Sequence, residues 1–99
     1  MDVLDEETVK LTAGHQILGW WTYILDTSDD DNYPFVSYGE ILLLDNGRIF
    51  SRGPSVKWGA AEAFWPDCRT VSEVEARAQR VGSNYELTRI DWRDTGASQ

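Results

Sequence analysis

The sequence predicts an α+β fold in which an antiparallel sheet of four to five strands packs against one helix at about residues 70–81. Two observations lead to this fold class. Strand-like segments flank the sequence Asp45-Asn46-Gly47, where Asn and Gly accept the positive φ angles of a tight reversal, and this predicts a hairpin. Apolar residues at helical spacing between Thr70 and Gly82 predict the helix.

The strands of the predicted sheet are rich in β-branched and aromatic residues. We expect strands at residues 15–25, 35–44, 48–52, 55–58 and 85–92. Near the N-terminus, Val9, Leu11 and Ala13 alternate with polar residues, which predicts a short strand or an extended lead-in. In the last strand the alternation changes phase between Leu87 and Ile90, and this predicts a bulge.

The helix has start and stop signals at its two ends. Thr70 and Glu73 have the spacing of a capping box, in which each side chain accepts from an otherwise unpaired backbone N–H. Gly82 follows the last apolar position, as a C-terminal stop does. The apolar stripe of this helix consists of Val71, Val74, Ala78 and Val81.

The chain has 99 residues, which is enough for one small core, and we expect residues 1–99 to form a single globular domain with flexible ends at 1–7 and 93–99. The sequence contains 5 Trp, and two of them, Trp20 and Trp21, are adjacent within a predicted strand. Successive side chains of a strand point to opposite faces of a sheet. Either both faces of the sheet are covered, or one of them is a binding surface.

The charge of the protein restricts its partners. Seventeen acidic residues against 9 basic ones give a formal net charge of −8. This charge repels nucleic acid phosphates and anionic membranes, so we expect no direct binding to either, and it favours a basic protein partner. The N-terminal segment lacks the features of a signal peptide, and the longest apolar stretch, residues 17–25, is too short to span a bilayer. We therefore expect a soluble cytoplasmic protein; in a second interpretation the acidity serves solubility alone.

Catalytic and cofactor motifs are weakly represented. A Cys68–His15 pair is disfavoured because the neighbouring Asp67 raises the pKa of the thiol. One His and one Cys are too few for a transition-metal site, and the sequence contains neither of the common glycine-rich phosphate-binding motifs. We therefore expect no enzyme, no cofactor and no metal. A third-ranked alternative is a ligand pocket between sheet and helix that uses Glu40, His15 or Tyr38.

The segment 24–35 is the most distinctive part of the sequence, because it contains four aspartates and two aromatic residues. A calcium loop counted from Asp26 would place Asp31 where a glycine is required, so a dedicated calcium site is not expected. The segment is either a solvated loop or an acidic patch with an aromatic rim. For the second interpretation, the predicted partner-binding residues are Asp26, Asp29, Asp30, Asp31, Tyr33, Phe35, Glu40 and Trp21.

These patterns favour a non-catalytic protein-binding module. In its most specific form, the hypothesis is that the protein is a small acidic inhibitor of a basic nucleic-acid-handling protein or toxin. Anti-defence and immunity proteins are comparable in size and charge. Carboxylates would then replace nucleic acid phosphates in the groove of the partner. The alternative is an accessory or structural subunit of a homo-dimer or a larger complex, in which the Trp-rich surface forms the subunit contact.

Overall fold

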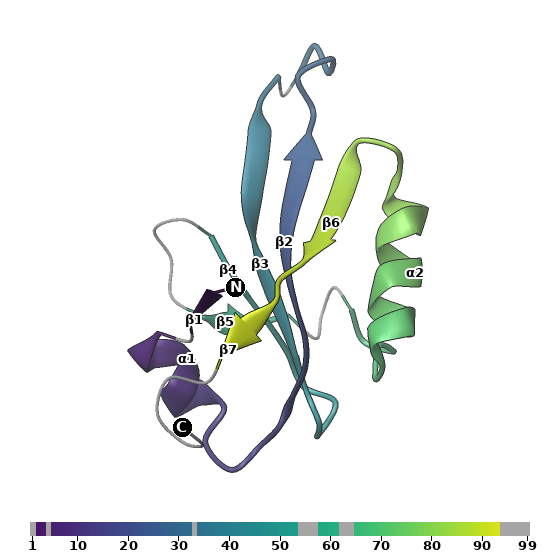
Figure 1. The fold of residues 1–99 in the computed structure, drawn as a ribbon. Coiled ribbons are helices and arrows are strands. Elements are labelled where there is room, and N and C mark those ends of the chain that lie inside the picture. The colour runs from purple at the N-terminus through teal and green to yellow at the C-terminus, as the bar shows by residue number, and fades with distance from the viewer. Residues whose placement is uncertain (1, 4, 33, 54–57, 62–64, 94–99) are drawn as a thin grey trace.

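The computed structural model describes residues 2–3, 5–32, 34–53, 58–61 and 65–93, and confirms the predicted α+β class. Within these residues, five antiparallel strands form one sheet in the order β5-β4-β3-β2-β6 (Figure 1). The elements in chain order are β1 (Asp2–Val3), α1 (Glu6–Leu11), β2 (Ile17–Asp26), β3 (Val36–Leu44), β4 (Ile49–Arg52), β5 (Gly59–Ala60), α2 (Val71–Val81), β6 (Tyr85–Arg89) and β7 (Trp92–Arg93).

The hairpin between β3 and β4 forms as the turn sequence predicts. Gly47 has a φ of 82°, and its N–H donates to the Leu44 carbonyl at 3.0 Å. The Leu44 N–H in turn donates to the carbonyl of Arg48 at 3.0 Å and closes the reversal. The two longest strands, β2 and β3, form a second hairpin whose connection contains the acidic segment.

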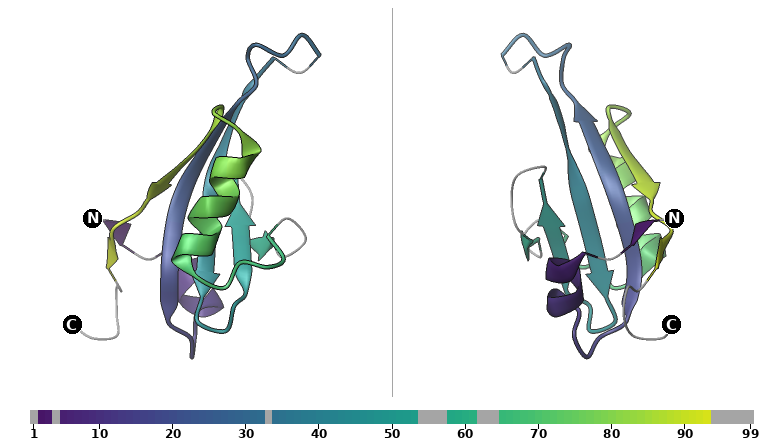
Figure 2. Two further views of the ribbon diagram at one scale, coloured as in Figure 1. Left: turned by 90° about the vertical axis from the view of Figure 1, so that its right-hand side faces the viewer. Right: turned by 60° about the vertical axis from the view of Figure 1, so that its left-hand side comes forward.

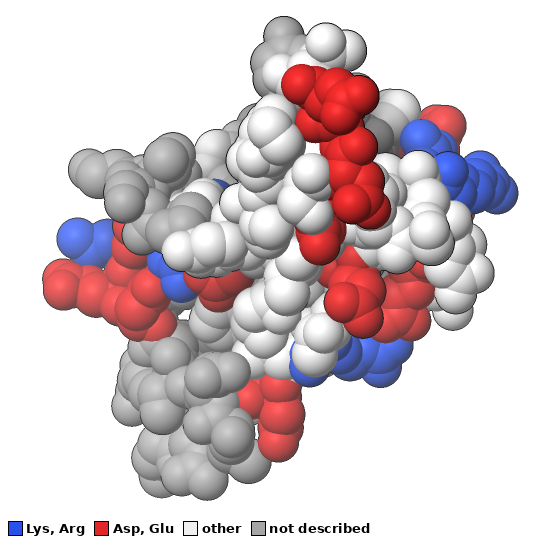
Figure 3. Space-filling view, turned by 90° about the horizontal axis from the view of Figure 1, so that it is seen from above, with Lys and Arg blue, Asp and Glu red and all other residues white. Residues whose placement is uncertain are grey.

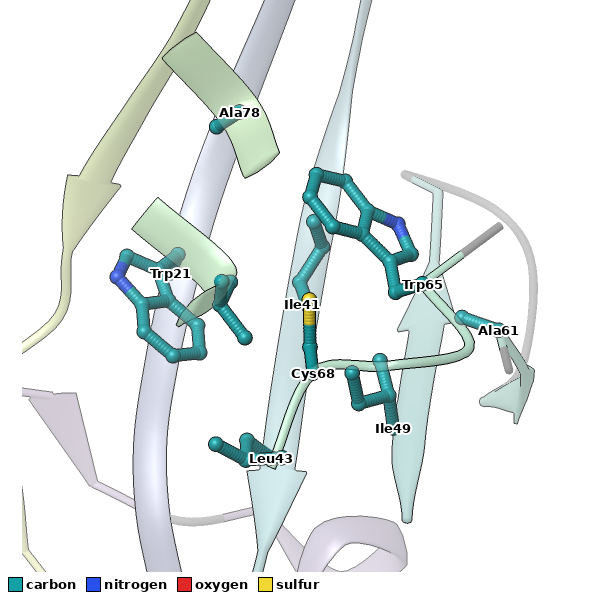
Figure 4. Packing of buried hydrophobic residues seen from close by; sticks show 9 residues of the cluster. Trp21, Ile41, Leu43, Ile49, Ala61, Trp65, Cys68 and Ala78 are labelled. Carbon is teal, nitrogen blue, oxygen red and sulfur yellow. The ribbon is translucent and has the colours of Figure 1, made fainter. Parts of the chain in front are cut away.

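Both faces of the sheet are covered around Trp20 and Trp21, which is one of the two arrangements that this pair of residues predicted. The two helices lie on opposite sides of the sheet, α2 beside the Trp21 face and α1 beside the Trp20 face (Figure 2). The first core cluster, toward α2, contains Trp21, Ile41, Leu43, Ile49, Ala61, Trp65, Cys68, Val74 and Ala78 (Figure 4). The second, toward α1, contains Trp20, Leu42, Leu44, Phe50 and Ile90, with Trp58 and Trp92 packed against it.

Helix α1 replaces the strand or extended lead-in that the alternation of Val9, Leu11 and Ala13 predicted. Its buried positions are occupied by Thr8 and, just past its end, Thr12, which are four residues apart, so the apolar residues alone do not show the helical period. The Thr8 hydroxyl accepts from the Trp58 indole N–H at 2.9 Å, which satisfies this buried polar group. Asp5 caps the helix by accepting from the Thr8 N–H at 2.7 Å.

Helix α2 begins at the predicted cap. The Thr70 hydroxyl accepts from the Glu73 N–H at 3.2 Å, while the Glu73 carboxylate accepts from the N–H of Arg69, one residue before the position expected for a capping box. The stripe is narrower than predicted, because Val81 at the end of the helix is 51% exposed. Gly82 ends the helix with a φ of 141°.

The predicted last strand is divided into two. β6 pairs with β2, and β7 forms a separate parallel pair with β1. Ile90 lies at the division, where its N–H donates to the Trp20 carbonyl at 2.8 Å and its side chain enters the second core cluster. The phase change in the sequence therefore marks the point at which the chain leaves the main sheet rather than a bulge.

Three sequence-based expectations fall wholly or partly outside the described residues. These are most of the strand expected at 55–58, all but Arg93 of the flexible end expected at 93–99, and the contact expected from Tyr33. The short β5 follows directly after Trp58 and forms the edge of the sheet next to β4.

Candidate functional site

The candidate site is the outer end of the β2–β3 hairpin, which projects beyond the rest of the fold (Figures 1 and 2). The molecule is elongated, with extents of 48 × 26 × 22 Å. The register between β3 and β4 ends where Glu40 opposes Arg52. In the described part of the chain, no strand pairs with the outer edge of β3 at residues 36–39. This end of the hairpin therefore presents both side chains and a strand edge to its surroundings.

Local hydrogen bonds shape the acidic loop at the tip. Thr27 donates its N–H to the Phe35 carbonyl at 2.8 Å and its hydroxyl to the same oxygen at 2.9 Å, which closes the base of the loop. The Asp30 carboxylate accepts from the Asn32 N–H at 2.8 Å and turns the chain in the middle of the aspartate run. The loop is thus a set of linked turns rather than an extended arc.

The aspartates of the tip are exposed and carry negative charge. Asp26 accepts from the Ser28 N–H at 2.9 Å, and this hydrogen bonding lowers the pKa of its carboxyl below the ordinary value. Seen from the hairpin end, Asp and Glu side chains gather in a run across this surface, and Lys and Arg side chains lie toward the sides (Figure 3). The predicted acidic residues present here are Asp26, Asp29, Asp30 and Asp31.

One face of the hairpin end is apolar and uncovered. Ile24 and Tyr38 are cross-strand neighbours in the register and are 46% and 58% exposed, and Val36, opposite Asp26, is 52% exposed. Together with Thr22 and Glu40 these side chains border a shallow concavity of about 390 Å³. Phe35, a predicted contact residue, is 47% exposed at the end of the acidic loop. We call Ile24, Val36 and Tyr38 the hairpin face.

Glu40 lies at the inner border of the hairpin face and is already engaged within the fold. Its carboxylate accepts from the Trp20 indole N–H at 2.9 Å and from Arg52 Nε at 2.8 Å. Arg52 also donates to Asp5 at 2.7 Å and lies over the Trp58 ring, 4.5 Å from its centroid. The structure therefore gives Glu40 a role in joining α1, β3 and β4, and the partner contact expected of it stays a prediction.

Trp21, the remaining predicted contact residue, has no exposed surface. Its side chain lies in the first core cluster, because its strand position points it toward α2, and its indole N–H donates to Glu75 at 3.0 Å. Trp20 is also buried on the other side of the sheet. This finding removes Trp21 from the predicted contact surface.

The residues considered for catalysis and metal binding are not brought together. Cys68 is buried, its thiol donates to the Glu73 carbonyl at 3.5 Å, and burial raises its pKa. His15 is exposed and contacts Asp45 at 3.1 Å. Among the residues that the structure describes, no three His, Cys, Asp or Glu side chains are grouped so as to hold a metal ion.

The sequence holds a further signal for this surface. Between Lys10 and Arg48 the chain contains neither Lys nor Arg, so both strands of the hairpin and its tip lack basic residues of their own. The hairpin face was not found from the sequence, because only the pairing register shows that Ile24, Val36 and Tyr38 share one side.

Comparison of the chain with protein-family models, with curated proteins and with solved structures gave no match. Within the described residues, neither helix has the length and apolar character needed to cross a membrane.

Proposed function

We propose that this protein is a non-catalytic binding module that inserts the end of its β2–β3 hairpin into a basic groove of another protein and thereby inhibits it. The partner is a nucleic-acid-handling protein or a toxin whose groove otherwise holds phosphates. The observation that carries the proposal is the proximity of two features on one projecting end. Exposed aspartates at 26 and 29–31 lie next to the exposed hairpin face.

The combination favours a contact surface over a solvated loop. A solvated acidic loop needs no apolar surface beside it, whereas protein interfaces combine an apolar centre with a polar rim. Four of the seven large hydrophobic residues that are exposed in the described chain lie on this hairpin end, namely Ile24, Phe35, Val36 and Tyr38. The hairpin face would supply the desolvated centre, and the aspartates the charged rim.

The hydrogen-bonded turns of the tip support the same function. Because Thr27, Asp30 and Asn32 already fix the loop through their hydrogen bonds, less conformational entropy is lost when the loop binds. Acidic side chains on a protein of net charge −8 also accelerate the encounter with a basic partner and make it sensitive to salt.

The test uses the tagged protein to capture partners from a lysate with and without nuclease, followed by competition with added DNA or RNA. The loop variant combines Asp29→Asn, Asp30→Asn and Asp31→Asn; the Asn at 30 keeps an acceptor for the Asn32 N–H. We expect the wild type to retain a basic protein at low salt, more strongly after nuclease treatment, and to lose it to added nucleic acid. The loop variant should not retain this protein.

A charge-matched control separates the effect of the aspartates in the loop from the effect of the net charge of the protein. Glu6→Gln, Glu7→Gln and Asp91→Asn change the net charge by the same amount as the loop variant, at exposed positions outside the hairpin. This control should capture the partner as the wild type does. Equal capture by both triple variants, or capture that added nucleic acid does not affect, would contradict the proposal.

The exposed strand edge favours a second candidate function, an accessory subunit. The edge of β3 at residues 36–39 and the hairpin face are suited to pairing with another strand, including that of a second copy. This candidate predicts a dimer in analytical ultracentrifugation that Tyr38→Ser dissociates and the loop variant leaves intact. A monomeric protein that captures its partner through the aspartates favours the inhibitor instead.

A further inference from the structure

A second concavity, of about 430 Å³, lies on the opposite side of the sheet from the hairpin face. It opens between the C-terminal half of α2 and strands β2 to β4, above the first core cluster. Ile41 and Ala61 contribute to its inner surface, and Val81 lies at its rim with 51% exposure. The volume falls in the range of sites that hold small organic molecules.

Three aromatic rings form much of its wall. Tyr23 and Tyr85 are stacked, with centroids 5.6 Å apart and planes inclined by 11°. Trp65 is inclined by 44° to Tyr85 at a centroid distance of 6.2 Å, and it lies beside Ile41 (Figure 4). Flat ring surfaces of this kind pack best against a planar, apolar ligand.

One basic side chain gives the concavity its polarity. Among the described lining residues, Arg77 is the only charged one, on a protein that is otherwise strongly acidic. Its contact with Asp67 is long, at 3.8 Å, and the Asp67 side chain is 88% exposed. A pair at this distance with one exposed partner contributes little, so a ligand anion can replace Asp67 at the guanidinium.

The other polar residues that line the concavity carry hydroxyl groups. They are Ser51, Tyr23 and Tyr85. Burial raises the pKa of Tyr85 to about 12, so its hydroxyl keeps its proton and can donate to an acceptor across the neutral range. One guanidinium balances the charge of a single carboxylate and can bind both of its oxygens in a bidentate arrangement.

We propose that this concavity binds a planar aromatic monocarboxylate of one or two rings, with the rings against Tyr23, Tyr85 and Trp65 and the carboxylate on Arg77. The proposal is independent of the hairpin end, because the two surfaces lie on opposite faces of the sheet. It assigns the protein a small-molecule site in addition to its protein-binding surface.

The test is an NMR titration of the ¹⁵N-labelled protein with 2-naphthoate and, as a neutral probe of the same shape, 2-naphthamide. We expect saturable shifts at the backbone amides of Ala61, Trp65 and Tyr85 with 2-naphthoate. Binding of 2-naphthamide should be weaker by about tenfold or more, as expected for loss of a hydrogen-bonded charge. Arg77→Gln should reduce 2-naphthoate affinity to a similar extent.

Arg80→Gln is the matched control, because Arg80 is an exposed arginine of the same helix that does not line the concavity. The affinity of this variant for 2-naphthoate should stay within about twofold of that of the wild type, since an exposed charge outside the concavity is screened by solvent and salt. Three results would overturn the proposal: equal affinity for the two probes, equal loss in both arginine variants, or shifts confined to the hairpin face. The comparison of the two probes uses the unaltered protein and does not depend on the folding of any variant.

Discussion

The indole N–H of Trp21 donates to the carboxylate of Glu75 at 3.0 Å, and this hydrogen bond links the centre of the sheet to helix α2. The same carboxylate accepts from Arg89 Nη2 at 2.9 Å. One acidic side chain thus joins the buried indole of β2, the helix, and β6 at the edge of the sheet. The hydrogen bonds from Trp21 and Arg89 lower the pKa of Glu75 below its ordinary value.

Glu75→Gln should make the free energy of unfolding less dependent on pH in the acid range. A carboxyl whose pKa is lowered in the folded state stabilises the protein above its unfolded value of 4.5, and this contribution is lost as the pH falls through the folded value. At neutral pH the variant should be less stable than the wild type by about 1 kcal/mol, with the difference narrowing below pH 4.5. Urea unfolding over a series of pH values measures this, and parallel curves for the two proteins would refute it.

A double-mutant cycle should reveal coupling between Arg52 and Glu40. The two side chains are 16% and 25% exposed and meet at 2.8 Å, so removing either one leaves the other partly buried without its partner. We expect a coupling energy of about 1–2 kcal/mol from the stabilities of Arg52→Met, Glu40→Gln and the double variant. The pair Lys10–Glu6, at 3.8 Å and largely exposed, provides a reference with a coupling of only about 0.3–0.5 kcal/mol. Similar values for both pairs would contradict the assigned role of Glu40.

Gly39→Ala should destabilise the sheet. A Cβ atom at this position would collide with the backbone carbonyl of Arg52 and approach the Tyr23 ring to 2.9 Å, and the carbonyl is held within β4. The expected loss is about 1–3 kcal/mol, the usual cost of overpacking, measured by thermal or urea unfolding. Gly59→Ala is the control, because a Cβ there meets nothing within 4 Å. Equal stability of the two variants would show that β3 and β4 can separate at Gly39 without loss.

Tyr38→Ser should remove partner binding without loss of stability. The Tyr38 side chain is 58% exposed, so its truncation should change the free energy of unfolding by less than about 0.5 kcal/mol. Capture of the basic partner should fall strongly, because exposed Tyr residues often carry a large share of interface energy. Val81→Ser, at a similarly exposed position on α2, should leave capture unchanged. Retained capture in Tyr38→Ser would place the contact on the aspartates alone.

Local signals in the sequence predicted most of the main sheet and α2. The turn at Gly47 and the cap at Thr70 act within a few residues, so their consequences are readable from the chain itself. Helix α1 does not follow from the apolar pattern because threonines occupy its buried positions. The Thr8 hydroxyl is satisfied by Trp58, fifty residues along the chain, whereas Thr12 bonds to carbonyls of its own helix. The separation of β7 from β6 depends on pairing with β1, which no local pattern encodes.

The sequence predicted the acidic part of the candidate site but not its apolar part. Its charge follows from composition and from the aspartate run, which are visible in the sequence. Its apolar part depends on which side of the sheet each residue faces, and this follows from the register that pairs Ile24 with Tyr38. The β2–β3 register also fixes Trp21 opposite Ile41 in the buried cluster beside α2, and the β3–β4 register places Glu40 opposite Arg52.

The parallel pairing of Asp2 with Trp92 has a consequence for the order in which the protein folds during synthesis. The β1–β7 pair cannot form until residue 92 has left the ribosome, and closing this loop carries a greater entropic cost than closing the short hairpin loops. Until then the Trp20 side of the sheet lacks Ile90 and Trp92, so part of its apolar surface stays open on the nascent chain. The buried residues of the Trp21 side end at Ala78, and the last residue packed against them is Leu87, so this side needs a shorter length of chain. The two faces of one small sheet therefore require different lengths of chain for their completion, and the α1 face requires the longer one.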